Sequence, residues 1–498
     1  MSTLGLELCD AGVQVAAAEK DGPQLLSPGT NGGAMDWPGY AYHDGQKFQF
    51  GRPAEDAWFV HPRSVAHSFL SKLTHEPSSL TIVGKPPSYS ELAFLFLRDF
   101  RQRLATSAGS IDKLVLAVPG SYLKDAATED EKIGLVLGMA GELKLPLAGI
   151  IDMACAALCD PRAGGFNPNL PVIVLDVQLQ GAEFTLFSTG ARLERQKFLQ
   201  LSQSGYAQLL KHLTGTMGNR FLRHTAFDIL ADGRIEQMFY RQTKDFMLGG
   251  AAEGRFQVNT SSRTYEMLVK HEQLVADASA FVGTLVQGLQ AFASAPGHGP
   301  EPCTLALTDR AVCLPGLEAR LRAAGFNRLL RLPRGAAASG AACIGQRRLT
   351  VPSDLSDVPV EISVPADDAC RATGAPWDAR LQKSRHTDPR PMPTHAVIDG
   401  IGHLMGGNGT FTIGSASACA DLALPEPFNA AGDCVVQLVR EGGRLWFVDP
   451  APPQAASTAA ESTLRTVVEA GDHLAIRCGT HAADVLFVHC EGSAAPRA

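Results

Sequence analysis

The stretch IVLDVQLQGAEFTL, residues 173–186, joins an apolar strand ending at Asp176 to a turn where phosphate chemistry could occur. Phosphate-binding hairpins present bare backbone N–H groups at this turn, which requires positive φ angles and no side chain in the way. Here Gln178, Leu179 and Gln180 stand where the glycines would be. The stretch therefore predicts the shape of a phosphate-binding hairpin without the main-chain donors that such a hairpin uses.

Four side chains near the C-terminus match zinc ligands in type and number: Cys478, His481, His489 and Cys490. Strand alternation would place adjacent His489 and Cys490 on opposite faces, so we interpret all four as buried or edge residues of the last strands. Cys155 and Cys159 lie one helical turn apart in an Ala-rich segment, where close packing explains them. No Cys-His or Ser-His-Asp arrangement can be assembled from spacing. We predict no catalytic residue and no metal site.

Length and charge restrict the class of protein. At 498 residues the chain is expected to form about two to four compact units. A composition of 45% apolar and 19% charged residues is typical of a folded globular protein. The net charge of −7 is mild and no block of like charges occurs, so nucleic acid is not an expected partner. We interpret the basic stretch from Arg320 to Arg334 as a solvated helix face followed by a loop.

Cysteine usage and the N-terminal segment bear on the compartment. Eleven cysteines are scattered without framework spacing, which favours free thiols and predicts a cytoplasmic protein. The N-terminal segment carries Glu7, Asp10 and Glu19 instead of a basic start and an apolar run. No window reaches eighteen uninterrupted apolar residues. We therefore expect neither a signal peptide nor membrane insertion.

The elements that must position these residues alternate between strands and helices. Alternating apolar and polar residues predict a hairpin over 4–22, and buried strands are expected at 113–122, 170–177 and 303–309. Helical spacing is found over these segments: 90–106, 128–145, 205–224, 262–293 and 316–326. This order is typical of α/β architecture with mixed sheets. No internal repeat stands out.

The amino-acid composition of the sequence changes at about residue 350. Residues 351–392 are rich in Pro, Asp and Thr and are expected to form a linker, with one docked strand favoured at VPVEISV, 358–364. Six short apolar runs then follow, separated by Gly, Pro and Asn: HAVIDG, GTFTIGS, CVVQLVR, GRLWFVD, HLAIRC and DVLFVHC. This spacing predicts a small all-β sandwich over 393–498.

Several motifs between residue 1 and about 346 are informative through the order in which they occur. LVLAVPGSYLKD is followed by a helix and by LAGIIDMACAALCD, then by TLALTDRAVCLPGLEARL and by the Ala-rich GAAASGAACIG. In this order they resemble pieces of the actin-like ATPase domain of DnaK-type heat-shock chaperones. The resemblance implies an α/β actin-like (ribonuclease H-like) ATPase fold in two lobes over residues 1–350.

Single positions decide what this resemblance implies for chemistry. Glu7 occupies the family's aspartate position in the first hairpin, and LCDAG replaces the Gly-Thr-Thr turn. Asp309 and Arg310 fall where the adenosine site has a Gly-Gly pair. The family's catalytic lysine aligns with Phe69 or with Lys72, depending on a gap.

Three carboxylates match the family's acidic positions around the Mg²⁺–phosphate site: Glu7, Asp152 and Asp176. Carboxylates converging on a cleft repel one another and raise their pKa values unless a cation lies there. Two interpretations stay open: Asp152 and Asp176 terminate or cap their elements, or the positions retain vestigial cation or nucleotide binding. Losing two or three hydrogen bonds to phosphate removes about 3–9 kcal/mol, and a micromolar site is worth only about 8 kcal/mol. ATP binding is therefore expected to be weak or absent.

The C-terminal segment has a framework of its own. FTIGSASACADLALPEPFNAAGDCVVQLVREGGRLWFVDP, followed by LRTVVEAGDHLAIRC, resembles a forkhead-associated domain, a reader of phosphothreonine peptides. Ser415 stands where the phosphate-binding arginine would be, Ala430 replaces the motif serine and Asp433 replaces the structural histidine. Without the guanidinium fork the charge-assisted bonds to phosphate are lost. We expect a forkhead-associated-like sandwich that docks through loops or an edge.

Together these features predict a non-catalytic, chaperone-like scaffold or adaptor without a cofactor, which binds protein partners through the C-terminal sandwich. The alternative is a divergent ATP-binding DnaK-type chaperone or nucleotide-switched assembly factor, with ATP and Mg²⁺ as cofactors and ATP hydrolysis as its activity. The family's peptide-binding β-sandwich and helical lid have no counterpart here, because the last ~105 residues match a different domain. No interface for self-assembly can be extracted from the sequence.

Overall fold

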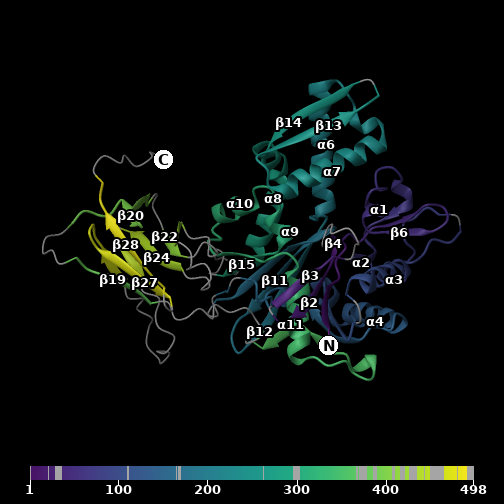
Figure 1. Cartoon of the computed structure of the whole chain (residues 1–498), viewed down its shortest axis with the longest axis horizontal. Helices are drawn as coiled ribbons and strands as arrows, with labels where there is room; N and C mark the ends of the chain where they lie inside the picture. Colours follow the sequence, from purple (N-terminus) through teal and green to yellow (C-terminus); the bar gives the residue numbers. More distant parts are fainter. Residues whose placement is uncertain are drawn as a thin grey trace. The chain divides into compact units, whose positions relative to one another are not determined.

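In the computed structural model the chain forms two compact units (Figure 1). The first comprises Met1–Ala163 and Pro168–Cys370, and the second comprises Gly164–Asn167 and Arg371–Ala498. The structure describes residues 2–20, 22–27, 36–82, 84–108, 111–163, 165–166, 170–261, 263–294, 303–365, 368, 378–384, 390–405, 410–414, 421–424, 435–441, 443–448, 465–478 and 481–490. Each unit is built around its own buried apolar side chains.

The first sheet of the first unit begins with a three-stranded antiparallel meander. β1 (Thr3–Glu7), β2 (Val13–Glu19) and β3 (Gly22–Leu26) pair in sequence. β8 (Lys113–Val118) pairs in parallel with β1, and β9 (Leu147–Asp152) pairs in parallel with β8. Nearly all residues of β1, β8 and β9 are buried, as expected for parallel strands covered on both faces.

The second sheet repeats this topology. β10 (Val172–Val177), β11 (Gly181–Ser188) and β12 (Arg192–Ser202) form an antiparallel meander. β15 (Thr304–Leu307) and β16 (Leu329–Arg331) add in parallel beside β10. β1 and β10 therefore occupy equivalent central places in their sheets. The two sheets thus share the same strand order, although no internal repeat stands out in the sequence.

Helices follow the same order in both halves. One helix precedes the first added parallel strand, one joins the two added strands, and one follows the second. In the first half these are α3 (Tyr89–Ala108), α4 (Ala126–Glu142) and α5 (Met153–Ala157). In the second half they are α8 (His271–Ala293), α10 (Leu317–Ala323) and α11 (Ala336–Arg348), and the short helix α9 (Asp309–Val312) is an additional helix between β15 and α10.

Helix α11 holds the two halves together through small residues. It follows β16 of the second sheet but packs against β1, β2 and α5 of the first half. A Cβ atom added at Gly340 would lie 1.8 Å from the Ala156 carbonyl oxygen, and one added at Gly5 would lie 2.0 Å from that of Ala338. Main chain therefore meets main chain here, at a distance that excludes any side chain.

Two further groups of elements complete the first unit. α6 (Tyr206–Thr225), α7 (Gly233–Gly249) and the hairpin β13 (Glu253–Asn259)–β14 (Thr264–Lys270) lie together in Figure 1. The prediction of one helix over 262–293 is wrong at its start, because residues 264–270 form β14. There Met267 and Val269 alternate with exposed residues and pack into the core, which is the strand period.

Several short elements carry or support site residues. They are β4 (Asp36–Trp37), β5 (Ala41–His43), β6 (Phe48–Phe50), α1 (Arg52–Glu55), η1 (Pro62–Ser64), β7 (Val65–Ala66), α2 (Phe69–Lys72), η2 (Gly120–Leu123), η3 (Ile229–Ala231), α9 (Asp309–Val312) and η4 (Leu355–Asp357). β5, β6 and β7 form a small sheet, and β4 pairs with β2. α9 begins directly after β15, next to the end of β10.

The segment expected to be a linker contributes two docked strands in place of one. β17 (Val360–Glu361) pairs in parallel with β9 of the first sheet. β18 (Ser363–Pro365) pairs with β12 of the second sheet. This short strap therefore extends both sheets of the first unit.

The second unit consists of two five-stranded sheets that share one core. One sheet has the order β19-β27-β28-β20-β21 and the other β23-β22-β24-β25-β26. The strand bounds are β19 Asp378–Gln382, β20 His395–Ile398, β21 Ile401–Leu404, β22 Thr410–Gly414, β23 Leu422–Ala423, β24 Val435–Glu441, β25 Arg444–Val448, β26 Arg465–Val468, β27 His473–Cys478 and β28 His481–Val488. Each of the six apolar runs beyond residue 393 falls on one of these strands.

Candidate functional site

Two of the three predicted acidic residues meet on one arginine. Glu7 ends β1 and Asp176 lies near the end of β10, so the duplicated topology brings the two carboxylates to equivalent strand ends. Arg310, in α9, donates through Nη2 to Glu7 Oε1 and to Asp176 Oδ1, the latter at 3.4 Å. Both carboxylates are buried. The cation that these positions require is therefore supplied by the chain itself.

Asp152 has a different partner. It ends β9 and caps α5, accepting hydrogen bonds from the backbone N–H groups of Ala154 at 2.9 Å and Cys155 at 3.1 Å. Arg195, on β12, donates to its Oδ2 at 2.7 Å. The structure thus places Asp152 outside the ion-pair cluster of Glu7 and Asp176, with a guanidinium of its own.

Burial and charge act against each other at these groups. Burial raises the pKa of Glu7 to about 7, although the Arg310 guanidinium lowers it. Burial likewise raises the pKa of Asp152 against the lowering effect of Arg195. For Arg310, burial lowers the pKa, but the charges of Glu7 and Asp176 outweigh it and raise the pKa well above its ordinary value. Arg310 is therefore a permanent cation in the cluster.

The first turn, LCDAG, is filled by a carboxylate. Asp10 accepts hydrogen bonds from the backbone N–H groups of Leu70 at 3.0 Å and Ser71 at 2.7 Å. Burial raises the pKa of Asp10 to about 7. Because the Asp10 side chain already accepts from these N–H groups, they are not available to a phosphate.

The second turn is engaged by α6. The backbone N–H groups of Tyr206 and Ala207 donate to the carbonyl oxygens of Gln178, at 2.8 Å, and Leu179, at 2.9 Å. Leu179 is buried in the core, and none of the turn residues Gln178, Leu179 and Gln180, all of which are described, adopts a positive φ. Gln180 Nε2 lies 2.8 Å from His67 Nδ1. This turn packs against its neighbours instead of presenting N–H groups to a ligand.

Neither candidate for the family's catalytic lysine reaches the cluster. Phe69 is fully buried in the apolar core beside β1. Lys72 donates from Nζ to the Tyr89 hydroxyl at 3.2 Å, on α3. The gap in the alignment therefore does not matter for chemistry, because both positions serve packing or local hydrogen bonding.

Glu183 is a site residue that the sequence analysis missed. It lies opposite Asp176 in the β10–β11 pairing. Its carboxylate accepts from the backbone N–H groups of Gly120 at 3.0 Å and Ser121 at 3.3 Å, at the start of η2. Burial raises its pKa to about 7. The hairpin register could have revealed it, since it aligns two acidic residues across one turn.

The pH dependence of stability is expected to report Glu183. A carboxyl group whose folded pKa is raised holds a proton that the unfolded chain has released, so stability is lost as pH rises from about 4.5 toward about 7. Glu183→Gln removes this titration. Relative to that variant, the wild-type free energy of unfolding should fall by about 2–3 kcal/mol between pH 5 and pH 8. Urea denaturation at several pH values measures it, and parallel profiles for the two proteins would contradict the assignment.

Arg310 lines two cavities, and the one that it shares with Glu7 and Asp176 is the smaller. A cavity of about 20 Å³ is lined by Glu7, Asp176, Glu183 and Arg310, among others. Such a volume holds about one water molecule and excludes a phosphate chain. Within the described ranges, no group of three or more His, Cys, Asp and Glu side chains is arranged to hold a metal ion.

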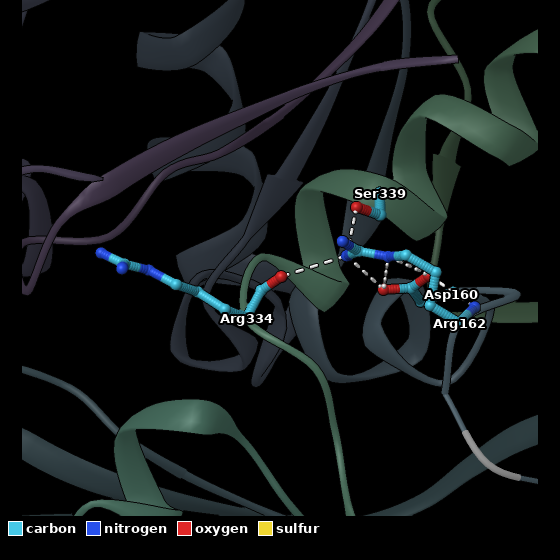
Figure 2. Close-up of polar contacts among 4 residues, drawn as sticks. All are labelled: Asp160, Arg162, Arg334 and Ser339. Atoms are coloured by element: carbon cyan, nitrogen blue, oxygen red, sulfur yellow. Dashed lines mark hydrogen bonds and ion pairs between the residues drawn. The ribbon is translucent and has the colours of Figure 1, made fainter. Parts of the chain in front are cut away.

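A further arginine crosses between the two halves of the first unit. Arg162, after α5, forms a bidentate pair with Asp160, which is fully buried, and donates to Ser339 Oγ at 2.7 Å and to the Arg334 carbonyl oxygen at 3.0 Å (Figure 2). Figure 2 shows the Arg334 guanidinium pointing away from this cluster. It donates to Asp36 at 2.9 Å. Polar bonds thus run in both directions between the halves.

The second unit gives less information about recognition. Ser415, Ala430 and Asp433, the three positions compared with phosphopeptide readers, lie outside the described residues. His489 and Cys490 are exposed, and His489 Nδ1 lies 2.9 Å from the Met392 carbonyl oxygen. Cys490 is a free thiol.

Comparison with known proteins adds no family assignment. The sequence matches no protein-family model and no curated protein. Among the helices that the structure describes, none has the length and apolar composition needed to cross a membrane.

Proposed function

We propose that this protein is a non-catalytic scaffold or adaptor, with a degenerate actin-like ATPase-type unit joined to a docking β-sandwich. The observation that carries the proposal is Arg310 between Glu7 and Asp176. A guanidinium there neutralises the two acids that would otherwise attract a metal–phosphate group, and it occupies the space such a group needs.

The actin-like assignment is part of this proposal. It is supported by the two sheets of equal strand order, each an antiparallel meander followed by two parallel strands. It is also supported by α11, which follows β16 of one sheet and packs on β1 of the other. A topology of this kind places the ends of β1 and β10 close together, as the contacts of Arg310 require.

Polar bonds between the halves favour a fixed framework over a nucleotide-driven cycle. Arg310, Arg195 and Arg162 each join residues of one half to the other, and Glu183 adds two bonds to η2. In an ATPase of this class, ligand binding would have to supply the free energy that closes the cleft. Here the side chains themselves supply it.

Partner docking is assigned to the second unit. β21 is the last strand in its sheet order, and its Ile401 and Leu404 side chains are exposed. The strand contains no Lys, Arg, Asp or Glu, the charged residues that usually protect a sheet edge. Such an edge can accept an extended segment of a partner protein as an added strand. The cysteines whose state is described, Cys9, Cys155, Cys159, Cys303, Cys313, Cys343 and Cys490, are free thiols, which supports the proposal of a cytoplasmic location.

Calorimetric titration with Mg-ATP tests the proposal against the nucleotide-binding alternative. We expect no saturable heat up to about 1 mM ATP, because the phosphate position is filled by side chains and lined by carboxylates. A dissociation constant below about 10 µM would overturn the scaffold proposal in favour of a divergent ATP-binding chaperone.

Affinity capture from a native lysate forms the second arm of this test. The whole chain should retain the same protein partners with and without Mg-ATP, and the double variant Ile401→Asp, Leu404→Asp should lose them. Both substitutions lie on exposed positions and should leave the melting temperature unchanged. Partners that dissociate on adding ATP would contradict a nucleotide-independent scaffold.

A further inference from the structure

The first unit contains a second, much larger cavity, of about 510 Å³. Its walls include Tyr40, Tyr206, Tyr240, Leu179 and Leu248. The three tyrosines and Leu179 are buried, whereas Leu248 is 45% exposed. This volume is in the range of cavities that hold small organic ligands, and the walls are largely aromatic and aliphatic.

The basic side chains on the cavity wall are already paired with carboxylates. The ion pairs are Arg162–Asp160, Lys244–Glu55, Arg310–Glu7, Arg331–Glu318 and Arg334–Asp36. A phosphate or carboxylate ligand would have to displace one of these partners. The wall therefore offers no free cation to an anionic ligand in the part of the chain that the structure describes.

Asp309 is the lining carboxylate that remains. It begins α9 and lines the cavity, and among the described residues it forms no ion pair. Burial raises its pKa, although Arg310 and Arg334 lower it. A ligand cation placed beside Asp309 would stabilise its charge and relieve part of this cost.

Acidic side chains of the cavity wall act on Tyr206. Burial raises the pKa of its hydroxyl, and the carboxylates of Asp309, Asp36 and Glu55 raise it further. All of these neighbours belong to the cavity wall. A ligand cation over the face of this ring would be attracted both by the π system and by the unpaired carboxylate of Asp309.

We propose that this cavity binds an organic cation, an amine or guanidine on an aromatic or aliphatic body. The cationic group lies beside Asp309, and the body packs against Tyr206, Tyr240 and Leu179. Asp309 and Arg310 line both this cavity and the small cavity beside Glu7 and Asp176. The inference nevertheless does not depend on the scaffold proposal, because it concerns a cationic ligand and not a nucleotide.

The probe for this site is tryptamine, compared with tryptophol, in which a hydroxyl replaces the ammonium group. Calorimetric titration of the full chain should show that tryptamine binds about 10-fold or more tightly than tryptophol. Asp309→Asn should weaken tryptamine binding by about 10-fold and leave tryptophol binding unchanged. ATP should not compete with tryptamine.

Two further variants keep the test decisive. Leu248→Arg adds a cation at the exposed mouth, where folding is not at risk, and should weaken tryptamine binding more than tryptophol binding. Asp357→Asn, outside the cavity wall, should change neither. The proposal is overturned if tryptamine gives no saturable heat up to about 5 mM, if tryptophol binds as tightly, or if Leu248→Arg affects both probes equally.

Discussion

Replacing Arg310 by methionine is expected to lower the free energy of unfolding by about 3–5 kcal/mol at neutral pH. The guanidinium contacts Glu7 and Asp176, which are 2% and 4% exposed. Methionine fills a similar volume but leaves two buried carboxylates without a counter-ion, and the small cavity beside them has room for only about one water molecule. Chemical denaturation followed by circular dichroism measures the loss.

The matched control is Arg331→Met. Its side chain is 57% exposed and pairs with Glu318 at the surface, so its loss should cost less than about 1 kcal/mol. Adding Glu7→Gln and Asp176→Asn to Arg310→Met should recover part of the stability, since neutral amides need no counter-ion. If Arg310→Met were as stable as the wild type, the cluster would not depend on this cation and the scaffold proposal would lose its main support.

The second large effect is expected at Gly340. An alanine Cβ there would lie 1.8 Å from the Ala156 carbonyl oxygen and 2.8 Å from its carbon, both main-chain atoms of α5. Relief requires α11 to move away from α5, which also loosens its contact with β1. We expect Gly340→Ala to destabilise the first unit by about 3 kcal/mol or more.

Gly215→Ala in α6 is the control for this substitution. Both glycines lie inside helices, but a Cβ at Gly215 meets no atom within 4 Å. The helix should therefore gain about 0.5–1 kcal/mol from the alanine. A thermal melt of the two variants in parallel shows whether close packing, and not helix propensity, determines the result; equal melting temperatures would contradict the proposed contact.

Short-range patterns predicted much of the fold. The six apolar runs after residue 393 fall on strands because alternation and turn residues act within a few positions. The same logic places β10 and its turn. It fails at residues 264–270, where pairing with β13 determines that the segment is a strand, and that partner is not visible in a helical count.

The site was harder to predict because its contacts are distant in sequence. Glu7 and Asp176 could be singled out, and Arg310 could be placed by its alignment with a glycine pair. The contact between the Arg310 guanidinium and Glu7, however, joins two positions that are 303 residues apart in the sequence. Arg195, which pairs with Asp152, lies on a strand with alternating exposed residues and carries no sequence signal. Tertiary topology, not local propensity, selects these partners.

The strap formed by β17 and β18 has a practical consequence for dissecting the protein. A recombinant fragment ending at residue 350 would lack Val360–Pro365 and leave β9 and β12 with unsatisfied backbone groups along their outer sides. Unpaired edge strands of this kind form backbone hydrogen bonds with strands of other molecules, so we expect such a fragment to aggregate. A fragment that ends after Cys370 keeps the pairings of β17 with β9 and of β18 with β12. Residue 370 is therefore the better C-terminal boundary for producing the first unit in isolation.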